Sequence, residues 1–404
     1  TSASALSVTG LSSVVIKDVF TPFGLFVMLF IIQFGGVGLT MMITLFWLVA
    51  RKKIGFKQRN MIMTDQNQLS RKGIVRFMRN VLIMIFTIEL IAFVVLTQYL
   101  YFSGHFPIYR EAAMQGLFLA ISLFTNAGFD IAPGADSFQM FRTDYFMQSA
   151  GMLLMLLGSI GFWTLAEIKE WIVAKLKRET FTFSYFVRLL IVLHLGLWLF
   201  GATVILFGEH NHFLQDKGVV ESIYYALFMS LTTRNAGFST MSVSDFTDAT
   251  QGFIIFLMFV GANPNSNGGG IRTTTLILVV LALIAFARDK RDVIIRKRTI
   301  KPETVYKALI AFMAGITVVS FALFILKTIE PMPFMHLLFE VTSAFGTTGL
   351  SLGITPELSP AAKFILVVVM FIGRLGIVAL LLMFRSERSG KKDYAYPQED
   401  VIVG

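Results

Sequence analysis

The 404-residue sequence contains no cysteine and few charged side chains. Without thiols, disulfides, thiolate metal sites and a cysteine nucleophile are all excluded. Only 15% of the residues are charged, whereas 55% are hydrophobic and the mean hydropathy is +0.71. Soluble domains carry about 25% charged residues. Most of this chain therefore does not face water, and the composition predicts an all-α polytopic membrane protein.

The sequence also lacks the groups that an enzyme or a nucleotide-binding domain would need. The apolar segments contain no HExxH motif, no paired aspartates and no serine–histidine pair, and the chain has no GxxxxGK[ST] motif. Intramembrane catalysis requires a convergent acid, base or nucleophile. The chain is therefore predicted not to be an enzyme, and any nucleotide must bind elsewhere.

Positive charge is plentiful but confined to the connectors between apolar segments. The net charge is +10, and basic residues cluster in residues 51–59, 169–178, 288–298 and 385–392. Acidic residues predominate in the connectors of the opposite side. This asymmetry indicates cytoplasmic basic connectors rather than a nucleic-acid-binding surface.

Seven long apolar segments are predicted to cross the membrane. They occupy residues 23–50, 81–102, 145–168, 186–207, 252–287, 304–327 and 361–384. Three shorter apolar segments lie between alternate pairs, at residues 112–124, 219–231 and 334–345. A helix of about 12 residues is about 18 Å long, too short to cross a hydrocarbon core of about 30 Å. The shorter segments are therefore predicted to be re-entrant half-helices.

Each half-helix runs into a polar string centred on a glycine, and a fourth such string lies near the N-terminus. The central glycines are Gly10, Gly128, Gly237 and Gly349, separated by 118, 109 and 112 residues. A fixed period of this kind indicates internal repeats. We place the four repeats at residues 1–59, 60–178, 179–298 and 299–404, the last with a cytoplasmic C-terminal tail. Since the chain begins at Thr1, inside the first pore segment, the leading helix of the first repeat is expected to be absent from this sequence.

The four strings are suited to binding a cation. Non-helical backbone is tolerated within a membrane only where protein buries it or where it lines a water-filled cavity. Glycine permits positive φ, so neighbouring carbonyl oxygens can turn inward and replace the hydration shell of a cation. The C-terminal end of each half-helix adds about half a negative charge. One such string would be an ordinary turn, whereas four at near-equal spacing predict a shared ion pore. The Thr and Asn side chains beside the glycines are expected to form hydrogen bonds behind each string and hold it open.

These features resemble the Trk/Ktr/HKT superfamily of potassium transporters, and the chain is most similar to the bacterial KtrB-type membrane subunit. The resemblance implies four helix–pore-helix–filter–helix repeats around one central pore. It also implies potassium uptake across the bacterial cytoplasmic membrane through a filter of backbone carbonyl groups. The implied filter residues are Val8, Thr9, Gly10, Asn126, Ala127, Gly128, Asn235, Ala236, Gly237, Thr347, Thr348 and Gly349.

The same resemblance implies partners and ligands. It implies a homodimer in membrane lipid with one pore per protomer, and a cytoplasmic ring of RCK-type, nucleotide-binding regulatory subunits like KtrA. Nucleotide is expected only on that partner, and no covalently bound cofactor is expected on this chain. Potassium is the expected substrate, and sodium is a candidate activator.

The predicted span at residues 252–287 is interrupted by a proline and a run of glycines. Pro264 cannot donate a backbone hydrogen bond and the glycines weaken the helix further, so the break is predicted to lie inside the membrane. In the family it resembles, this segment, residues 261–275 here, is a gate loop beneath the filter. The alternative is a kink held by neighbouring helices. The implied gate residues are Gly261, Asn263, Asn265, Asn267, Gly268, Gly269, Gly270 and Arg374.

Arg374 lies in the middle of the last predicted span. A charge there costs about 2.5–3.5 kcal/mol on insertion scales. Arg374 is therefore expected to contact the loop and to oppose cation passage, or alternatively to pin two helices together. Glu89 and His194, isolated in apolar spans, are expected to form hydrogen bonds between helices, and Glu340 is expected to brace the fourth string.

A secondary active cation symporter, coupled to sodium or protons, is the alternative function. Broken helices also mark the binding sites of such transporters. These transporters tend to consist of two related halves, whereas this chain contains four related strings. The repeat number therefore favours a single-chain pore.

Overall fold

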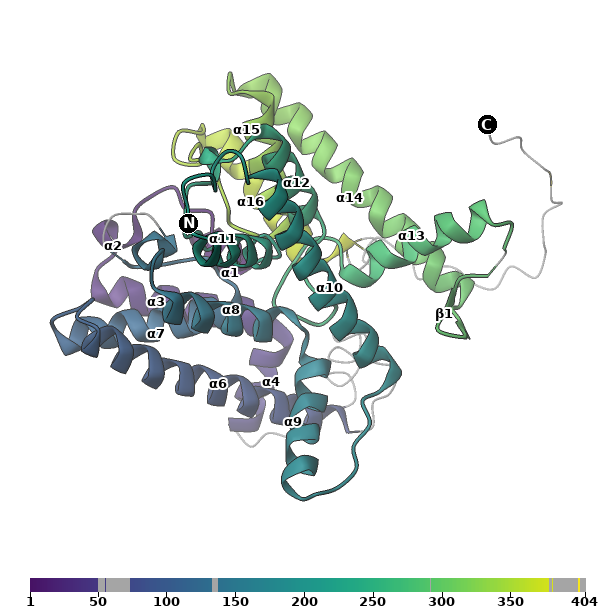
Figure 1. The fold of residues 1–404 in the computed structure, drawn as a ribbon, viewed down its shortest axis with the longest axis horizontal. Helices are drawn as coiled ribbons and strands as arrows, with labels where there is room; N and C mark the ends of the chain where they lie inside the picture. Colours follow the sequence, from purple (N-terminus) through teal and green to yellow (C-terminus); the bar gives the residue numbers. More distant parts are fainter. Residues whose placement is uncertain are drawn as a thin grey trace.

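The computed structural model describes residues 1–49, 73–132, 137–290 and 292–377, and residues 55, 380 and 399 singly. Within these residues the chain is almost entirely α-helical (Figure 1). The two strands found there, β1 (Ile294–Ile295) and β2 (Arg298–Thr299), form a short antiparallel hairpin. The predicted all-α polytopic fold is confirmed.

Three helices are long and apolar enough to cross a membrane. They are α6 (Ile74–Phe102), α10 (Tyr185–Gly208) and α14 (Pro302–Ile329). The shortest of them has 24 residues, which gives a length of about 36 Å. They match three of the predicted spans, and two bent helix pairs raise the possible number of spans among the described residues to five.

The predicted spans at residues 23–50 and 145–168 each correspond to a pair of helices joined at a sharp bend, and each pair can form one bent span. The paired helices are α3 (Pro22–Val37) with α4 (Leu39–Val49), and α8 (Tyr145–Ser159) with α9 (Phe162–Leu176). The pairs are bent by 106° and 110°. The glycines at the bends, Gly38 and Gly161, have φ of 91° and 99°. A right-handed helix cannot pass through this conformation.

The remaining two spans are also interrupted. Residues 252–287 form α12 (Asp248–Phe259) and α13 (Thr273–Ala287), separated by the predicted non-helical segment. In the last span, α16 (Pro360–Leu375) ends at Gly376, whose φ is 82°. Most of the remainder of that span lies outside the described residues, as do the connector at residues 51–59, except residue 55, and most of the C-terminal tail.

Short helices precede each of the four polar strings. They are α1 (Ser2–Ser7), α7 (Tyr109–Thr125), α11 (Val219–Thr232) and α15 (Phe334–Gly346). The last three closely match the predicted half-helices. α7 packs against α6, α11 against α10, and α15 against α14. The smaller elements are α2 (Ile16–Val19), η1 (Ser137–Phe141) and η2 (Val243–Asp245).

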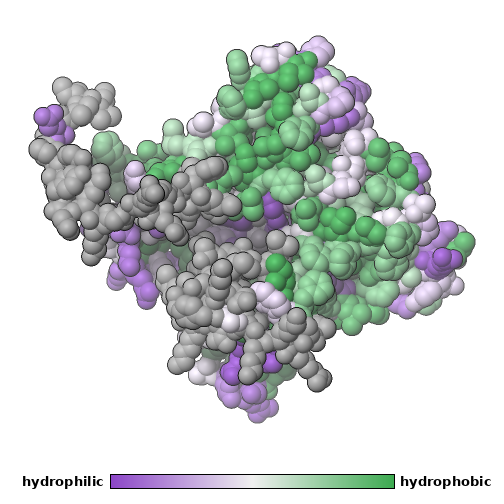
Figure 2. Space-filling view, turned by 180° about the vertical axis from the view of Figure 1, so that it is seen from behind, coloured by the Kyte–Doolittle hydropathy of each residue, from purple (hydrophilic) through white to green (hydrophobic). Residues whose placement is uncertain are grey.

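The outer surface of the helices is strongly apolar. Figure 2 shows apolar side chains over much of one face, with hydrophilic residues gathered toward its edges. Phe23, Phe207 and Phe286 are 79%, 77% and 86% exposed. A soluble monomer rarely exposes apolar patches of this extent. The surface is therefore one that hydrocarbon covers.

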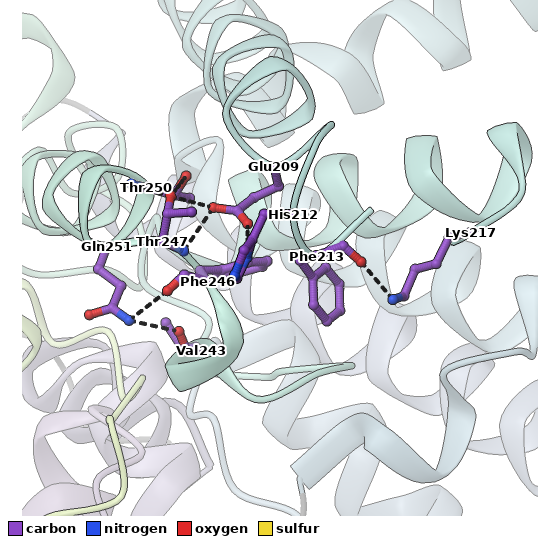
Figure 3. Close-up of polar contacts among 9 residues, drawn as sticks. All are labelled: Glu209, His212, Phe213, Lys217, Val243, Phe246, Thr247, Thr250 and Gln251. Carbon is purple, nitrogen blue, oxygen red and sulfur yellow. Dashed lines mark hydrogen bonds and ion pairs between the residues drawn. The ribbon is translucent and has the colours of Figure 1, made fainter. Parts of the chain in front are cut away.

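A buried carboxylate ties the end of α10 to the start of α12 (Figure 3). Glu209 is fully buried and accepts hydrogen bonds from the Thr247 N–H at 3.0 Å and the Thr247 hydroxyl at 2.8 Å, with His212 Nδ1 at 3.3 Å. Burial disfavours the charged carboxylate, but hydrogen bonds from Thr250, Thr247 and His212 outweigh that effect and lower the pKa of Glu209. The carboxylate therefore stays ionised.

Comparable links join two other helix pairs. At the end of α14, Glu330 accepts a hydrogen bond from the N–H of Ser359, the residue that caps α16, at 2.9 Å. Asp144, which caps α8, accepts from the Tyr99 hydroxyl of α6 at 2.9 Å. An acidic residue thus joins the C-terminal part of each long helix to the N-terminus of the helix beyond the string.

Replacing Glu209 with alanine is expected to destabilise the protein by about 1.5–3 kcal/mol, the cost of losing hydrogen bonds to a buried charged group. Because the pKa of Glu209 is lowered in the folded protein, its stabilisation is present at neutral pH and is lost as pH falls through that pKa. Melting temperatures in detergent at pH 7 and pH 4 would measure this. Glu170→Ala, at an exposed position on α9, is the control; equal melting temperatures for the two variants at pH 7 would contradict the expectation.

Candidate functional site

A residue with positive φ follows each short helix: it is the C-cap of α1, α7 and α15, and it lies two residues beyond the C-cap of α11. Val8, Asn126 and Thr347 have φ of 58°, 59° and 50°, and Asn235 has φ of 83°. The central glycine, two residues further on in every case, also has positive φ, between 71° and 98°. Positive φ is unusual for β-branched residues such as Val8. The same strained conformation at four related positions indicates that the four strings share one backbone design.

The four central glycines meet at one place. A β-carbon added to Gly10 would lie 3.1 Å from the Cα of Gly128 and 3.2 Å from the Cα of Gly349. A β-carbon on Gly237 would likewise lie 3.1 Å and 3.2 Å from these same two atoms. Each glycine therefore has two others as neighbours, in the cyclic order 10, 128, 237, 349. Any larger residue would collide with the adjoining string.

A carbonyl oxygen from each string lies at the same ring. The oxygens of Ala127 and Ala236 would be 2.9 Å and 3.0 Å from β-carbons added to Gly10 and Gly128, respectively. The oxygens of Thr348 and Thr9 similarly adjoin Gly237 and Gly349, where an added β-carbon would overlap them. The residue before each glycine thus places its oxygen against the glycine of the preceding string in that cyclic order. This arrangement is a ring of four backbone oxygens, a geometry that can replace the water around a monovalent cation.

Hydroxyl groups of the short helices hold the strings from behind. Ser122 donates to the Phe129 carbonyl at 2.7 Å and accepts from the Phe129 N–H at 3.1 Å. Thr232 donates to the Phe238 carbonyl at 2.6 Å, and Ser343 accepts from the Gly349 N–H at 3.1 Å.

The string residues themselves contribute less to this bracing than the sequence predicts. Asn235 donates to the carbonyl of Gly346 and to Thr347 Oγ1, the latter at 3.3 Å. The Asn126 amide, in contrast, has no hydrogen-bond partner among the described residues. The strings are therefore held chiefly by the short helices behind them.

The loop between α12 and α13 reaches three of the strings. Asn267 Nδ2 donates to the Phe124 carbonyl, just before the second string, at 2.8 Å. Gly261 and Gly268 pack closely against the Asn235 side chain in the third string. The Gly269 N–H donates to Thr347 Oγ1 in the fourth string at 2.9 Å. The loop therefore lies directly beneath the glycine ring.

Other loop residues fasten it to the neighbouring helices. Asn263 Nδ2 donates to the carbonyls of Ile160 and Leu190 at 3.0 Å and 3.3 Å. The Asn265 carbonyl accepts from the N–H of Phe162 at 2.7 Å. The Gly270 N–H donates to the Gly373 carbonyl on α16 at 3.2 Å.

Arg374 links the loop to the N-terminal part of the chain. Its guanidinium group donates to the carbonyls of Asn267 and Gly35, and to that of Gly36 at 3.2 Å. The predicted contact between Arg374 and the asparagine-rich loop is present. The carbonyls of Gly35 and Gly36 belong to the last turn of α3, so Arg374 also joins α16 to α3.

Sequence reasoning missed two features around the loop. Arg272, within the loop segment, donates to the carbonyl of Gly268 and to that of Asn263, the latter at 3.5 Å. The sequence does contain a signal for this arginine, because a charged residue closely follows three glycines inside an apolar span. Gly158 and Gly373 pack so tightly on the carbonyls of Phe124 and Phe345 that an added β-carbon would overlap them.

The isolated polar residues of the apolar spans have partners. Gln33 donates to both carboxylate oxygens of Glu89, at 3.0 Å and 2.9 Å. His194 Nε2 lies 3.1 Å from the Ser159 hydroxyl. These two interhelical contacts agree with the sequence prediction.

Two further polar residues lie beside the third and fourth strings. Glu340 accepts hydrogen bonds from Ser351 and Thr355, the second at 3.0 Å, and braces the fourth string as predicted. Arg234, which is 1% exposed, donates to the His194 carbonyl at 2.8 Å rather than pairing with an acid.

The apolar helices, together with the family to which the chain belongs, define a multi-pass membrane protein of the ion-transport class, not an enzyme. The TrkH family of cation transport proteins matches residues 1–392. The chain belongs to this family, and its resemblance to the Trk/Ktr/HKT superfamily and to the KtrB-type subunit is confirmed. It is a multi-pass protein of the bacterial plasma membrane.

Two relatives are the Ktr system potassium uptake proteins D and B of Bacillus subtilis, which are 43% and 33% identical over 404 and 411 residues. Each alignment covers 100% of this chain and 88% of the relative. The crystal structure of the potassium transporter TrkH from Vibrio parahaemolyticus matches with a TM-score of 0.74 and 18% identity, over 95% of this chain and 76% of that one. The structural match supports the fold.

Replacing Gly158 with alanine is expected to destabilise the protein by about 1–3 kcal/mol, because the new methyl group would overlap the Phe124 carbonyl and force the α8–α7 contact apart. The control is Gly196→Ala in α10, where an added β-carbon meets no atom within 4 Å. Thermal melting in detergent should show a loss for the first variant and none for the second. A Gly158→Ala protein as stable as the control would contradict the close approach.

Proposed function

We propose that this chain is the ion-translocating subunit of a bacterial potassium-uptake system. The observation that carries the proposal is the ring at which Gly10, Gly128, Gly237 and Gly349 meet, with one backbone oxygen from each string. In this proposal the filter comprises the twelve residues of the strings, residues 8–10, 126–128, 235–237 and 347–349. The ion passes through the ring and gives up water for carbonyl oxygens.

Two observations favour potassium as the substrate: the chemistry of the ring oxygens and the names of similar proteins. The ring offers neutral carbonyl oxygens and no carboxylate, a ligand set that suits a weakly hydrated monovalent cation better than a divalent one. The Bacillus subtilis relatives are named as potassium uptake proteins. The ends of α7 and α15 point toward the ring and add partial negative charge there.

In the proposed mechanism the loop at residues 261–275 is a gate. It lies beneath the ring, and its hydrogen bonds to Phe124, Thr347 and Gly373 are single contacts to backbone or hydroxyl groups. Such contacts can be exchanged for water at modest cost. Arg374 opposes cation passage by its charge and holds the loop through Asn267.

The proposal extends to organisation and regulation. The four repeats at residues 1–59, 60–178, 179–298 and 299–404 each supply one string. In this proposal the chain forms a homodimer and works with a cytoplasmic, nucleotide-binding regulatory subunit; the names of the relatives, which place them in a Ktr system, support a partner of some kind. The basic connectors on one side of the membrane provide the docking surface for that partner.

Serine in place of Gly128 is expected to abolish high-affinity potassium uptake or to admit sodium, because the side chain would press on the Gly237 string. The test is growth at low potassium of a bacterium that lacks its own potassium-uptake systems, with rubidium and sodium fluxes measured in parallel. Gly196→Ser, in open space on α10, is the matched control. Wild-type-like uptake by Gly128→Ser would overturn the filter assignment.

Replacing Arg374 with glutamine should change the maximal rate of uptake by at least severalfold, because it removes both the charge in the ion path and a donor to the loop. Initial rates of rubidium uptake in the same strain measure this, with Arg188→Gln at an exposed position on α10 as the control. If Arg374→Gln kept the wild-type rate while folding normally, the gating role would be removed.

A further inference from the structure

A cavity of about 510 Å³ opens on the side of the glycine ring opposite to the loop. All four central glycines contribute to its floor, so the cavity leads directly to the ring. Its walls come from the segments that follow the four strings. This cavity is named the outer cavity.

The residue two positions after each central glycine lines the outer cavity in all four strings. These residues are Ser12, Asp130, Ser239 and Ser351. They form a second layer of side-chain oxygens immediately outside the ring of backbone oxygens. Three of the four are neutral hydroxyls and one is a carboxylic acid, so the layer carries a charge in only one repeat.

The four residues also share a local hydrogen-bond pattern. Each side-chain oxygen bonds to the backbone of the residue two positions further on. Ser12 donates to the Val14 carbonyl at 2.7 Å and Ser239 donates to the Met241 carbonyl. At the other two strings the oxygen accepts: Asp130 from the Ala132 N–H at 3.0 Å, and Ser351 from the Gly353 N–H at 2.9 Å.

The charge of Asp130 is therefore not required by its turn, since serine makes the corresponding turn at three other strings. One oxygen of Asp130 is held by Gln115 Nε2 at 2.6 Å and by Ala132. The other oxygen is buried and accepts no hydrogen bond of normal geometry from the described residues. A buried carboxylate oxygen without a partner is costly unless a cation or a donor approaches it.

The electrostatic balance of the outer cavity depends on two side chains. Among the described residues that line it, Asp130 and Lys17 are the charged ones. The positive charge of Lys17 offsets part of the negative charge of Asp130, so the field in the cavity depends on both side chains.

We propose that the outer cavity is a cation-entry site in which Asp130 attracts a partly hydrated monovalent cation and passes it to the carbonyl ring, with Lys17 limiting the affinity. This inference rests on the proposed potassium-uptake function and adds a site to it. Low-dielectric walls focus the field of a single carboxylate and raise the local concentration of cations. The hydroxyls of Ser12, Ser239 and Ser351 provide neutral oxygens to replace part of the hydration shell.

The test compares Asp130→Ser, which copies the residue of the other three strings, with the wild-type protein and with Lys17→Gln. At low ionic strength, Asp130→Ser should raise the potassium concentration for half-maximal uptake by about 3–10-fold with little change in maximal rate. Lys17→Gln should lower it, and Ser239→Asp, which adds a second carboxylate, should also lower it. These shifts should shrink in high salt as the charges are screened. An unchanged potassium dependence of uptake in Asp130→Ser at low ionic strength would overturn the entry site.

Binding to the purified protein separates this inference from the proposed function. Calorimetric titration of the detergent-solubilised protein with potassium chloride should show weaker binding for Asp130→Ser than for the wild type, at equal melting temperature. If the wild type failed to restore uptake but showed this difference, the proposed function would fail and the entry site would stand. Equal binding by the two proteins would overturn the entry site whatever the uptake result.

Discussion

Backbone carbonyl groups without helical partners are the constraint that organises the interior of this protein. A hydrocarbon environment offers no water to such groups, and each one left unpaired costs several kcal/mol. The short helices, the bent spans and the strings all end or interrupt helices and so leave carbonyls without helical partners. Asn263, Asn267 and Arg374 each donate to carbonyls at these helix ends. These polar side chains of the interior thus provide hydrogen-bond donors to backbone carbonyls that have no helical partner.

Close packing between helices, as well as positive φ, explains why glycine occurs at particular positions in this protein. Gly158 and Gly373 let α8 and α16 touch the terminal carbonyls of Phe124 and Phe345, at the ends of α7 and α15. Such contact shields both carbonyls from lipid, and the Phe124 carbonyl also accepts a hydrogen bond from Asn267. The carbonyl oxygens of Thr9, Ala127, Ala236 and Thr348 instead adjoin the central glycines of neighbouring strings. The positions of the glycines therefore determine which of these carbonyl oxygens a helix covers and which lie at the ring.

The sequence permitted prediction of the long helices, the half-helices and the four strings, because apolar length and a repeated polar motif are local features. It did not permit prediction of the bends at Gly38 and Gly161, since a glycine inside an apolar run does not by itself stop a helix. The contact of Arg374 with the loop was predicted from the cost of an isolated charge. Its bonds to Gly35 and Gly36 join positions about 340 residues apart, and no local pattern encodes such a pairing.

The four strings share a backbone conformation but differ in the charged side chains next to them. The positive-φ residue after each short helix and the turn after each glycine are common to all four. Asp130 occurs after the second string, Arg234 immediately before the third and Glu340 behind the fourth. A symmetric ring needs matched backbone geometry to present equivalent oxygens, and this leaves side chains outside the ring free to differ. Charge can therefore be adjusted on either side of the ring without disturbing the spacing of the oxygens.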